Sequence, residues 1–138
     1  MFDPVVVLRV GSILALASLA ACGGASSAPV PSPAARRGEA VFIQNCAHCH
    51  VVNSGKWRDA PSLRNILGRK AGSTSFPYSP AFRHVDLVWT RENLDKYLAD
   101  PRRTVPGNEM AFFGMPDAAA RSDLIAYLAL MSPSAPRQ

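Results

Sequence analysis

Apolar residues recur at helical spacing in three separate stretches of the chain. The first, "RRGEAVFIQNCAHCH", places apolar side chains from Ala40 to Ile43 and again at Cys46, which predicts a short amphipathic helix that enters at Gly38. No stretch alternates apolar and polar residues convincingly with the period of two that a half-buried strand requires. The pattern therefore predicts an all-α body with long loops.

The other two stretches carry recognisable end signals. In "VWTRENLDKYLADP", Thr90 is a candidate N-cap and Pro101 stops the helix. In "DAAARSDLIAYLALMSP", Asp117 is the candidate N-cap. The predicted buried faces are Leu94, Tyr97 and Leu98 in the former stretch, and Leu124, Ile125, Leu128 and Met131 in the latter.

The N-terminal residues form an apolar run of a different kind. The 12 residues from Val10 to Ala21 hold no charge, but they are too few to span a bilayer, which takes about 20 residues. An uncleaved anchor starting at Val5 would have to take Arg9 into the bilayer, which costs a few kcal/mol. Residues 1–21 are therefore interpreted as a cleaved secretory signal peptide.

The apolar run ends in "LAAC", which resembles the lipobox of bacterial lipoproteins. In that family the cysteine is linked to diacylglycerol and the signal is cut just before it, so the resemblance implies that Cys22 is the lipidated first residue of the mature protein. The alternative is an ordinary signal peptide followed by a chance cysteine. Residues 22–35 hold no charge and three prolines, and predict a flexible linker that keeps a domain over residues 36–133 near a membrane. Residues 134–138 are a short C-terminal tail.

The formal charge of +5 comes from 15 basic and 10 acidic side chains. Such a surplus supports weak, steerable contact with acidic surfaces. Twelve of the basic residues are arginines spread along the chain, which differs from the dense basic stripe of a nucleic-acid-binding protein. We therefore expect no nucleic-acid partner.

The strongest chemical signal is "CAHCH", in which His50 directly follows a pair of cysteines, Cys46 and Cys49. A thioredoxin-like redox pair would need an alternating βαβ pattern around it, and none is present. A zinc site needs four ligands, and His48 and His84 are not at ligand-like spacing from the pair. A disulfide across two intervening residues would be strained and would leave His50 without a role.

Covalent attachment of a c-type haem uses all three residues. Three residues make about one helical turn, so the sulfurs of Cys46 and Cys49 lie on one side of the segment. His50 is four residues from Cys46, on the same side, and can turn a ring nitrogen onto the iron. A buried haem would also supply the apolar mass that three helices lack. If Cys22 is lipidated, no free thiol remains in the chain.

The second axial position of the iron has several candidates. Met131 lies on the buried face of the last predicted helix, and His84 lies in a loop between two helices and fits only a bis-histidine site. Met115 lies between Gly114 and Pro116, and a Met-Pro step carries the ligand in some cytochromes. Met110 lies in "VPGNEMAFFG", an irregular loop that could lay a thioether against a flat macrocycle. The residues alone leave these alternatives open.

From residue 38 to residue 131 the chain resembles the class I cytochromes c. The matching segments, in the family's order, are "GEAVFIQNCAHCH", "APSLRNILGRKAG", "FPYSPA", "WTRENLDKYLADP", "VPGNEMAFFG" and "RSDLIAYL". The resemblance implies a fold of three main helices and loops wrapped around one covalently bound haem c. It also implies that His50 and Met110 are the axial ligands, with Met110 preferred over Met115.

Further roles follow from the same resemblance. The carbonyl of Pro61 would accept a hydrogen bond from the far nitrogen of His50. Tyr97 would approach the sulfur of Met110, and Phe112 would pack over the haem edge. The residues expected to contact the haem propionates are Arg69, Tyr78, Trp89 and Asn108. Gly38 and Phe42 would pack on Leu124 and Tyr127, where the first and last helices cross.

The chain departs from the family pattern at several positions. Ala60 replaces a glycine, Phe82 replaces an asparagine, and Asn108 and Glu109 replace a threonine and a lysine. The family's ring of lysines is thin, since the chain holds only Lys56, Lys70 and Lys96. Arg102 and Arg103 partly compensate.

The resemblance and the N-terminal signals together imply a membrane-tethered, monomeric, single-haem electron carrier on the periplasmic side of a bacterial membrane. Electrons would pass from a quinol:cytochrome c reductase to a terminal oxidase or photosynthetic reaction centre, and these redox partners would present acidic docking patches. One alternative is a fixed cytochrome subunit of a larger oxidoreductase. Another is a haem enzyme such as a peroxidase, which needs a vacant or displaceable ligand.

Overall fold

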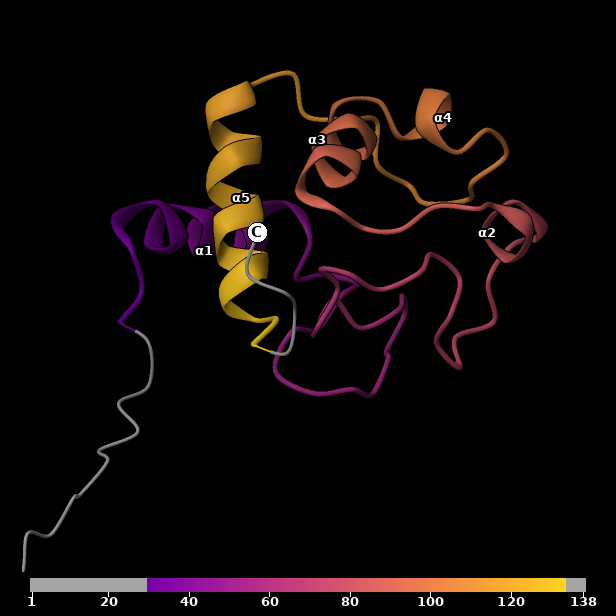
Figure 1. The fold of residues 1–138 in the computed structure, drawn as a ribbon, viewed down its shortest axis with the longest axis horizontal. Helices are drawn as coiled ribbons and strands as arrows, with labels where there is room; N and C mark the ends of the chain where they lie inside the picture. The colour runs from indigo at the N-terminus through magenta and orange to yellow at the C-terminus, as the bar shows by residue number, and fades with distance from the viewer. Residues whose placement is uncertain (1–29, 134–138) are drawn as a thin grey trace, which may run out of the picture.

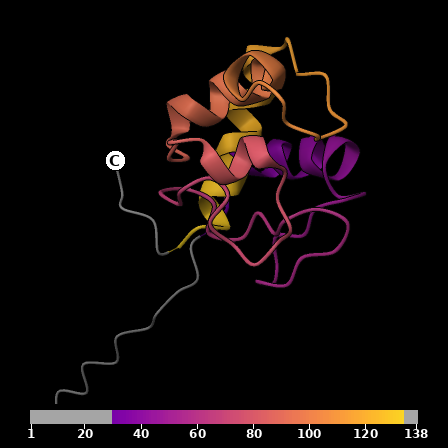
Figure 2. The same ribbon diagram turned by 90° about the vertical axis from the view of Figure 1, so that its right-hand side faces the viewer.

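The computed structural model describes residues 30–133, and Figures 1 and 2 show them in two perpendicular views. The elements, in chain order, are α1 (Pro33–Asn45), α2 (Pro80–His84), α3 (Arg91–Ala99), α4 (Pro101–Thr104) and α5 (Ala118–Leu130). The described residues form no strand and a single β-bridge, between Lys70 and Val88. The predicted all-α fold with long loops is confirmed. The predicted signal peptide, Cys22, most of the predicted linker and the predicted C-terminal tail lie outside the described residues.

The helix α1 crosses α5, and α3 packs beside α5 (Figure 1). A long segment without regular helices runs from the end of α1 to α2 and fills the lower part of the molecule in both views. The segment between α4 and α5 fills part of the upper side. No helix within residues 30–133 combines the length and the apolar character needed to cross a bilayer.

The helix α1 begins earlier than predicted. Ser32 is its N-cap, with the side-chain oxygen accepting a hydrogen bond of 3.1 Å from the amide of Ala35, and Pro33 occupies the first helical position. Proline suits that position because its missing N–H would have no partner there. The predicted entry at Gly38 is therefore wrong, and residues 33–35, which the linker prediction included, belong to the helix, with Ala35 buried.

The crossing of α1 and α5 is close at Gly38. The glycine is buried against Asp123 and Tyr127, and the rings of Phe42 and Tyr127 lie 5.5 Å apart. The guanidinium of Arg37 donates two hydrogen bonds, of 2.7 and 2.8 Å, to the carboxylate of Asp123 across the same crossing. The predicted packing of the first helix on the last is confirmed.

The end signals of α3 and α5 are also confirmed. Thr90 accepts a hydrogen bond of 3.2 Å from the amide of Asn93, and Asp117 accepts from the amides of Ala119 and Ala120. The predicted buried residues Leu94, Tyr97, Leu98, Leu124, Ile125 and Leu128 are all in the core. Met131 follows the last residue of α5 and is partly buried against that core.

Two short helices, α2 and α4, were not predicted. Both begin with a proline at the first helical position, Pro80 and Pro101. Pro101 therefore both ends α3 and opens the next helix. His84 is the last residue of α2, which corrects its predicted place in a loop.

Candidate functional site

The cysteine pair lies where α1 ends. Cys46 is the C-cap of the helix, and its amide still donates to the carbonyl of Phe42 at 2.8 Å. The amide of His50 donates to the carbonyl of Cys46 at 2.9 Å, which is the hydrogen bond of one further helical turn. This bond keeps Cys46 and His50 on the same side of the segment, although the regular helix itself ends at Asn45. Cys46 is partly buried and Cys49 is exposed.

The imidazole of His50 is held by Pro61. Its Nδ1 lies 2.7 Å from the carbonyl oxygen of Pro61, as predicted from the resemblance. A carbonyl oxygen can only accept, so Nδ1 carries the hydrogen and the lone pair of the neutral ring is on Nε2. Burial lowers the pKa of His50, while the hydrogen bond to Pro61 opposes that shift. The net lowering favours the neutral form that binds metal.

Arg58 connects the cysteine turn, residues 46–50, to the loop that follows it. Its guanidinium donates to the carbonyl of Ala47 at 2.9 Å and also to that of His48. The amide of Ala60 donates to the carbonyl of Cys49 at 3.2 Å. Sequence reasoning missed Arg58. The available signal was an arginine close in sequence to a turn whose carbonyls have no helical partner.

Met110 lies in the segment between α4 and α5 and is partly buried against the hydrophobic core that Cys46 also contacts. The hydroxyl of Tyr97 donates to the Met110 sulfur at 3.6 Å, the approach predicted from the resemblance. Burial raises the pKa of the Tyr97 phenol well above its usual range, so the hydroxyl keeps its hydrogen and remains a donor.

The other three ligand candidates have different surroundings. Met115 is only 8% exposed, and its amide donates to the carbonyl of Leu98 at 2.7 Å. Met131 packs against the core after the end of α5. His84 is exposed, and its Nδ1 lies 2.8 Å from the carbonyl of Pro80 in its own helix.

Arg69, Tyr78 and Trp89, the other residues predicted to contact the propionates, lie near one another. Burial lowers the pKa of Arg69, and the charge interaction with Tyr78 opposes this, which reflects how close the two side chains are. Arg69 donates to the carbonyls of Arg64 and Ser62 at 2.9 and 2.8 Å, and the Tyr78 hydroxyl pairs with Thr74 at 2.8 Å. The ring of Phe82 lies between Tyr78 and Trp89, with centroid distances of 5.9 and 6.4 Å.

Ser79, the residue after Tyr78, has a buried hydroxyl with no hydrogen-bond partner within the described residues. A buried hydroxyl without a partner carries a desolvation cost, which a bound polar group would remove. Sequence reasoning missed Ser79, because the sequence does not reveal that its hydroxyl is buried. An unsatisfied donor beside Tyr78 fits an acidic group of a cofactor at this place.

Asn108, which was predicted to contact a haem propionate, makes its side-chain hydrogen bonds inside its own loop. Its side-chain nitrogen donates to the carbonyls of Pro101 and Val105 at 2.9 and 2.8 Å, and its side-chain oxygen accepts from the amide of Met110 at 3.2 Å. An amide nitrogen has two hydrogens, and both are used inside the loop.

Two consecutive phenylalanines follow Met110. Phe112 is partly buried and packs against the core. Phe113 is 82% exposed, and the Arg102 guanidinium lies 5.2 Å from the centre of its ring. This distance is within the range of a cation–π contact. Sequence reasoning missed Phe113, which could have been noticed as the second of two adjacent large apolar residues in this loop.

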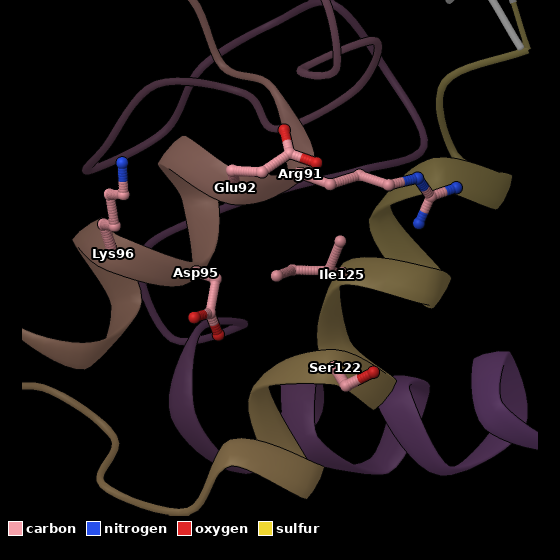
Figure 3. A pocket seen from close by; sticks show the side chains of 6 residues that line it. All are labelled: Arg91, Glu92, Asp95, Lys96, Ser122 and Ile125. Atoms are coloured by element: carbon pink, nitrogen blue, oxygen red, sulfur yellow. The ribbon is translucent and has the colours of Figure 1, made fainter. Parts of the chain in front are cut away.

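A shallow hollow of about 440 Å³ lies between α3 and α5 (Figure 3). It is lined by Arg91, Glu92, Asp95, Lys96, Ser122 and Ile125. None of these is a predicted site residue, and charges of both signs meet there. The lining contains no cysteine, histidine or methionine, so it is not part of the candidate haem site.

The alternatives for the cysteine pair find no support in the structure. Within residues 30–133, no group of three or more His, Cys, Asp or Glu side chains is arranged to hold a metal ion. Cys46 and Cys49 are not joined by a disulfide. Burial raises the pKa of the Cys46 thiol to about 11, whereas a reactive redox cysteine has a lowered pKa.

Comparisons with known proteins identify the family. The profile of the Cytochrome c family matches residues 35–132. The chain belongs to the cytochrome c family. It is 42% identical to cytochrome c type-1 of Ascaris suum over 100 residues, which are 72% of this chain and 89% of the relative. It is 38% identical to cytochrome c 2.1 of Caenorhabditis elegans over 104 residues, 75% of this chain and 94% of that relative.

A solved structure agrees with these relatives. Cytochrome cH from Methylobacterium extorquens matches with a TM-score of 0.65 and 36% identity, over 69% of this chain and 96% of that chain. This cytochrome therefore has the class I fold and carries one covalently attached haem c, and Cys46 and Cys49 fit the attachment motif. It is an electron carrier rather than an enzyme.

Proposed function

We propose that this cytochrome is a membrane-tethered, single-haem electron carrier whose iron is bound by His50 and Met110. The observation that carries the proposal most directly is the 2.7 Å contact between Nδ1 of His50 and the carbonyl oxygen of Pro61. It fixes the tautomer that leaves Nε2 free for a metal, and it sets the orientation of the ring.

Met110 is supported as the second ligand by the donor that reaches its sulfur. Tyr97 holds the thioether at 3.6 Å, while Met115 is buried in the core with its backbone bonded to α3. When bound, the haem supplies an iron that changes between the ferrous and ferric states. A thioether ligand raises the reduction potential by favouring the ferrous state. With His50 and Met110 as its two ligands, the iron would have no site open to a substrate, as an electron carrier requires.

The propionates of the haem would be held by Arg69, Tyr78, Ser79 and Trp89. The buried Ser79 hydroxyl and the nearby Arg69 guanidinium supply the donors that a buried carboxylate needs. Because the amide hydrogens of Asn108 are already used, we leave that residue out of this set.

Docking to redox partners would use the surface around Phe113. An exposed aromatic ring with an arginine stacked on it resembles the anchors that dominate many protein interfaces. Arg102 and Arg103 lie next to one another in α4 and are both exposed. A partner with a carboxylate rim around an apolar pocket would complement this surface. The ring is three residues from Met110, so docking there would bring the partner near the haem edge.

The finer functional assignments rest on the sequence. The signal peptide and the lipobox support export and a lipid anchor at Cys22 on the periplasmic side of a bacterial membrane. The linker from Cys22 to the start of α1 would then keep a monomeric cytochrome near membrane-bound partners and raise its effective concentration. A quinol:cytochrome c reductase would be the donor, and a terminal oxidase or photosynthetic reaction centre would be the acceptor.

The intact mass of the native protein tests the tether. We expect the mass of the chain from Cys22 to Gln138 plus one haem and acyl groups. A chain that begins elsewhere, or an unmodified Cys22, would contradict the anchor. Purification in mild detergent distinguishes a freely moving electron carrier from a fixed subunit of a larger oxidoreductase. A freely moving carrier should be isolated alone, whereas a stable complex of several subunits would indicate a fixed subunit.

A further inference from the structure

The side chain of Asn108 joins three separate parts of the backbone. It donates to Pro101 at 2.9 Å and to Val105 at 2.8 Å, and it accepts from the amide of Met110 at 3.2 Å. The orientation of the amide group is chemically determined, because a flipped amide would point its oxygen at two carbonyls and its nitrogen at an N–H.

The two carbonyls that Asn108 contacts belong to residues with fully buried side chains. Pro101 and Val105 are both among the four largest side chains that are less than 2% exposed. They are the first residue of α4 and the residue directly after its end. Asn108 therefore connects the backbone of Met110 to the packed core, two residues before the sulfur-bearing side chain.

Met110 makes three hydrogen bonds, one of which is the local bond of 2.8 Å from the Phe112 amide to its carbonyl. Asn108 bonds its backbone amide, and Tyr97 bonds its sulfur at 3.6 Å. The turn between Val105 and Asn108 depends on Gly107, whose φ of +79° favours glycine.

We propose that Asn108 is a positioning residue for Met110, and that its bonds to Pro101 and Val105 set how firmly the sulfur is presented to the iron. The inference rests on the proposed function in taking Met110 as the sixth ligand. It assigns Asn108 to the thioether side of the site instead of to the propionates.

The test measures the affinity of imidazole for the ferric holoprotein, since imidazole competes with the methionine sulfur for the sixth position. Asn108→Asp keeps the size of the side chain and the acceptor toward the Met110 amide, but it loses both donors. Asn108→Ala removes all three bonds. Since the loss of these hydrogen bonds would hold the sulfur less firmly, we expect imidazole to bind about tenfold or more tightly to both variants than to the wild type.

Two controls separate positioning from general loss of stability. Asn45→Asp changes an exposed asparagine that donates to Val41 in its own helix, and we expect no change in imidazole affinity. Leu128→Ala destabilises the core within α5, and we expect a lower thermal midpoint without a comparable gain in imidazole affinity. Wild-type affinity in Asn108→Asp would overturn the inference, as would an equal gain in Leu128→Ala.

The near-infrared band of the ferric wild-type protein tests the proposed ligand Met110 separately from the positioning role of Asn108. This weak band requires bound methionine sulfur, and its absence from the wild type would refute the proposed ligand itself. If the band is present and the Asn108 variants keep wild-type imidazole affinity, only the positioning role fails. If the midpoint potential of Asn108→Asp shifts with pH while its imidazole affinity stays unchanged, Asn108 contacts the propionates and the inference is overturned.

If Asn108→Asp does not mature with haem, Asn108→Ser replaces it in the test. Because serine keeps one donor, we expect a smaller gain in imidazole affinity.

Discussion

A Cβ atom placed on Gly38 would lie 1.9 Å from the carbonyl oxygen of Asp123. The obstacle is backbone of the facing helix, so it cannot move aside as a side chain would. The same atom would lie 2.9 Å from Cβ of Tyr127. The crossing of α1 and α5, which delivers the cysteine turn to the core, therefore requires glycine at this position.

We expect Gly38→Ala to lower the free energy of unfolding by about 2 kcal/mol or more, because overpacking of a rigid contact forces the helices apart. Urea unfolding of the holoprotein, followed by circular dichroism, measures the effect. Gly55→Ala is the matched control, since a Cβ there would meet no atom within 4 Å, and we expect it to be neutral or slightly stabilising. Equal losses in the two variants would contradict the close crossing.

Much of the fold could be predicted because its signals are local. Thr90 and Asp117 accept hydrogen bonds from amides two or three residues away, so both N-caps can be predicted from the sequence alone. Ser32 and Pro33 carry an equally local signal, but they lie in a stretch rich in serine, proline and alanine whose composition indicated a linker. The start of α1 was misplaced for that reason.

The site was predicted less completely because its details depend on distant contacts. The bonds of Asn108 to Pro101 and of Arg58 to Ala47 join residues that are seven and 11 positions apart, and neither follows the pattern of a regular helix. Which partner an amide or a guanidinium finds there is decided by the path of the loop. Similarly, the missing partner of the Ser79 hydroxyl becomes visible only when its burial is known.

Arg121 connects the segment that contains Met110 and Met115 to α3. Its guanidinium donates to Asp95 of α3 at 2.7 Å and to the carbonyls of Met115 and Pro116 at 2.8 and 2.9 Å. A lysine cannot make these bonds at once, because it lacks the planar fork of donors. We expect Arg121→Lys to lower the free energy of unfolding by about 2 kcal/mol. Arg91→Lys, at an exposed position of α3, should lie within about 0.5 kcal/mol of the wild type, and a similar loss there would argue against the specific role of Arg121.

The burial of Tyr97 leads us to expect that the free energy of unfolding depends on pH in the alkaline range. Burial raises the pKa of its phenol above the usual value, which is about 10 in unfolded chains. The folded state therefore holds the proton more tightly, so the contribution of the neutral phenol is fully present below about pH 10 and is lost as the pH rises further. Above about pH 10, the free energy of unfolding should fall more steeply for the wild type than for Tyr97→Phe. Parallel pH profiles would mean that the phenol is not buried.

Phe113 predicts where redox partners bind. We expect Phe113→Ala to leave the haem spectrum unchanged and to lower the rate of electron transfer to a membrane-bound terminal oxidase by about tenfold at limiting concentration, as for a truncated interface anchor. Ile43→Ala is the control, because Ile43 is an apolar side chain on α1 with 58% of its surface exposed. Equal rates for Phe113→Ala and the wild type would move the docking surface elsewhere.

The near-infrared absorption of the ferric protein tests the proposed iron ligands most directly, through paired substitutions of the two methionines. Met115→Leu is a volume-conserving change of a buried core residue, and we expect it to retain the weak band of bound methionine sulfur. Met110→Ala should lose that band and open the sixth position to imidazole. A band that survives in Met110→Ala, or disappears in Met115→Leu, would contradict the ligand pair of His50 and Met110.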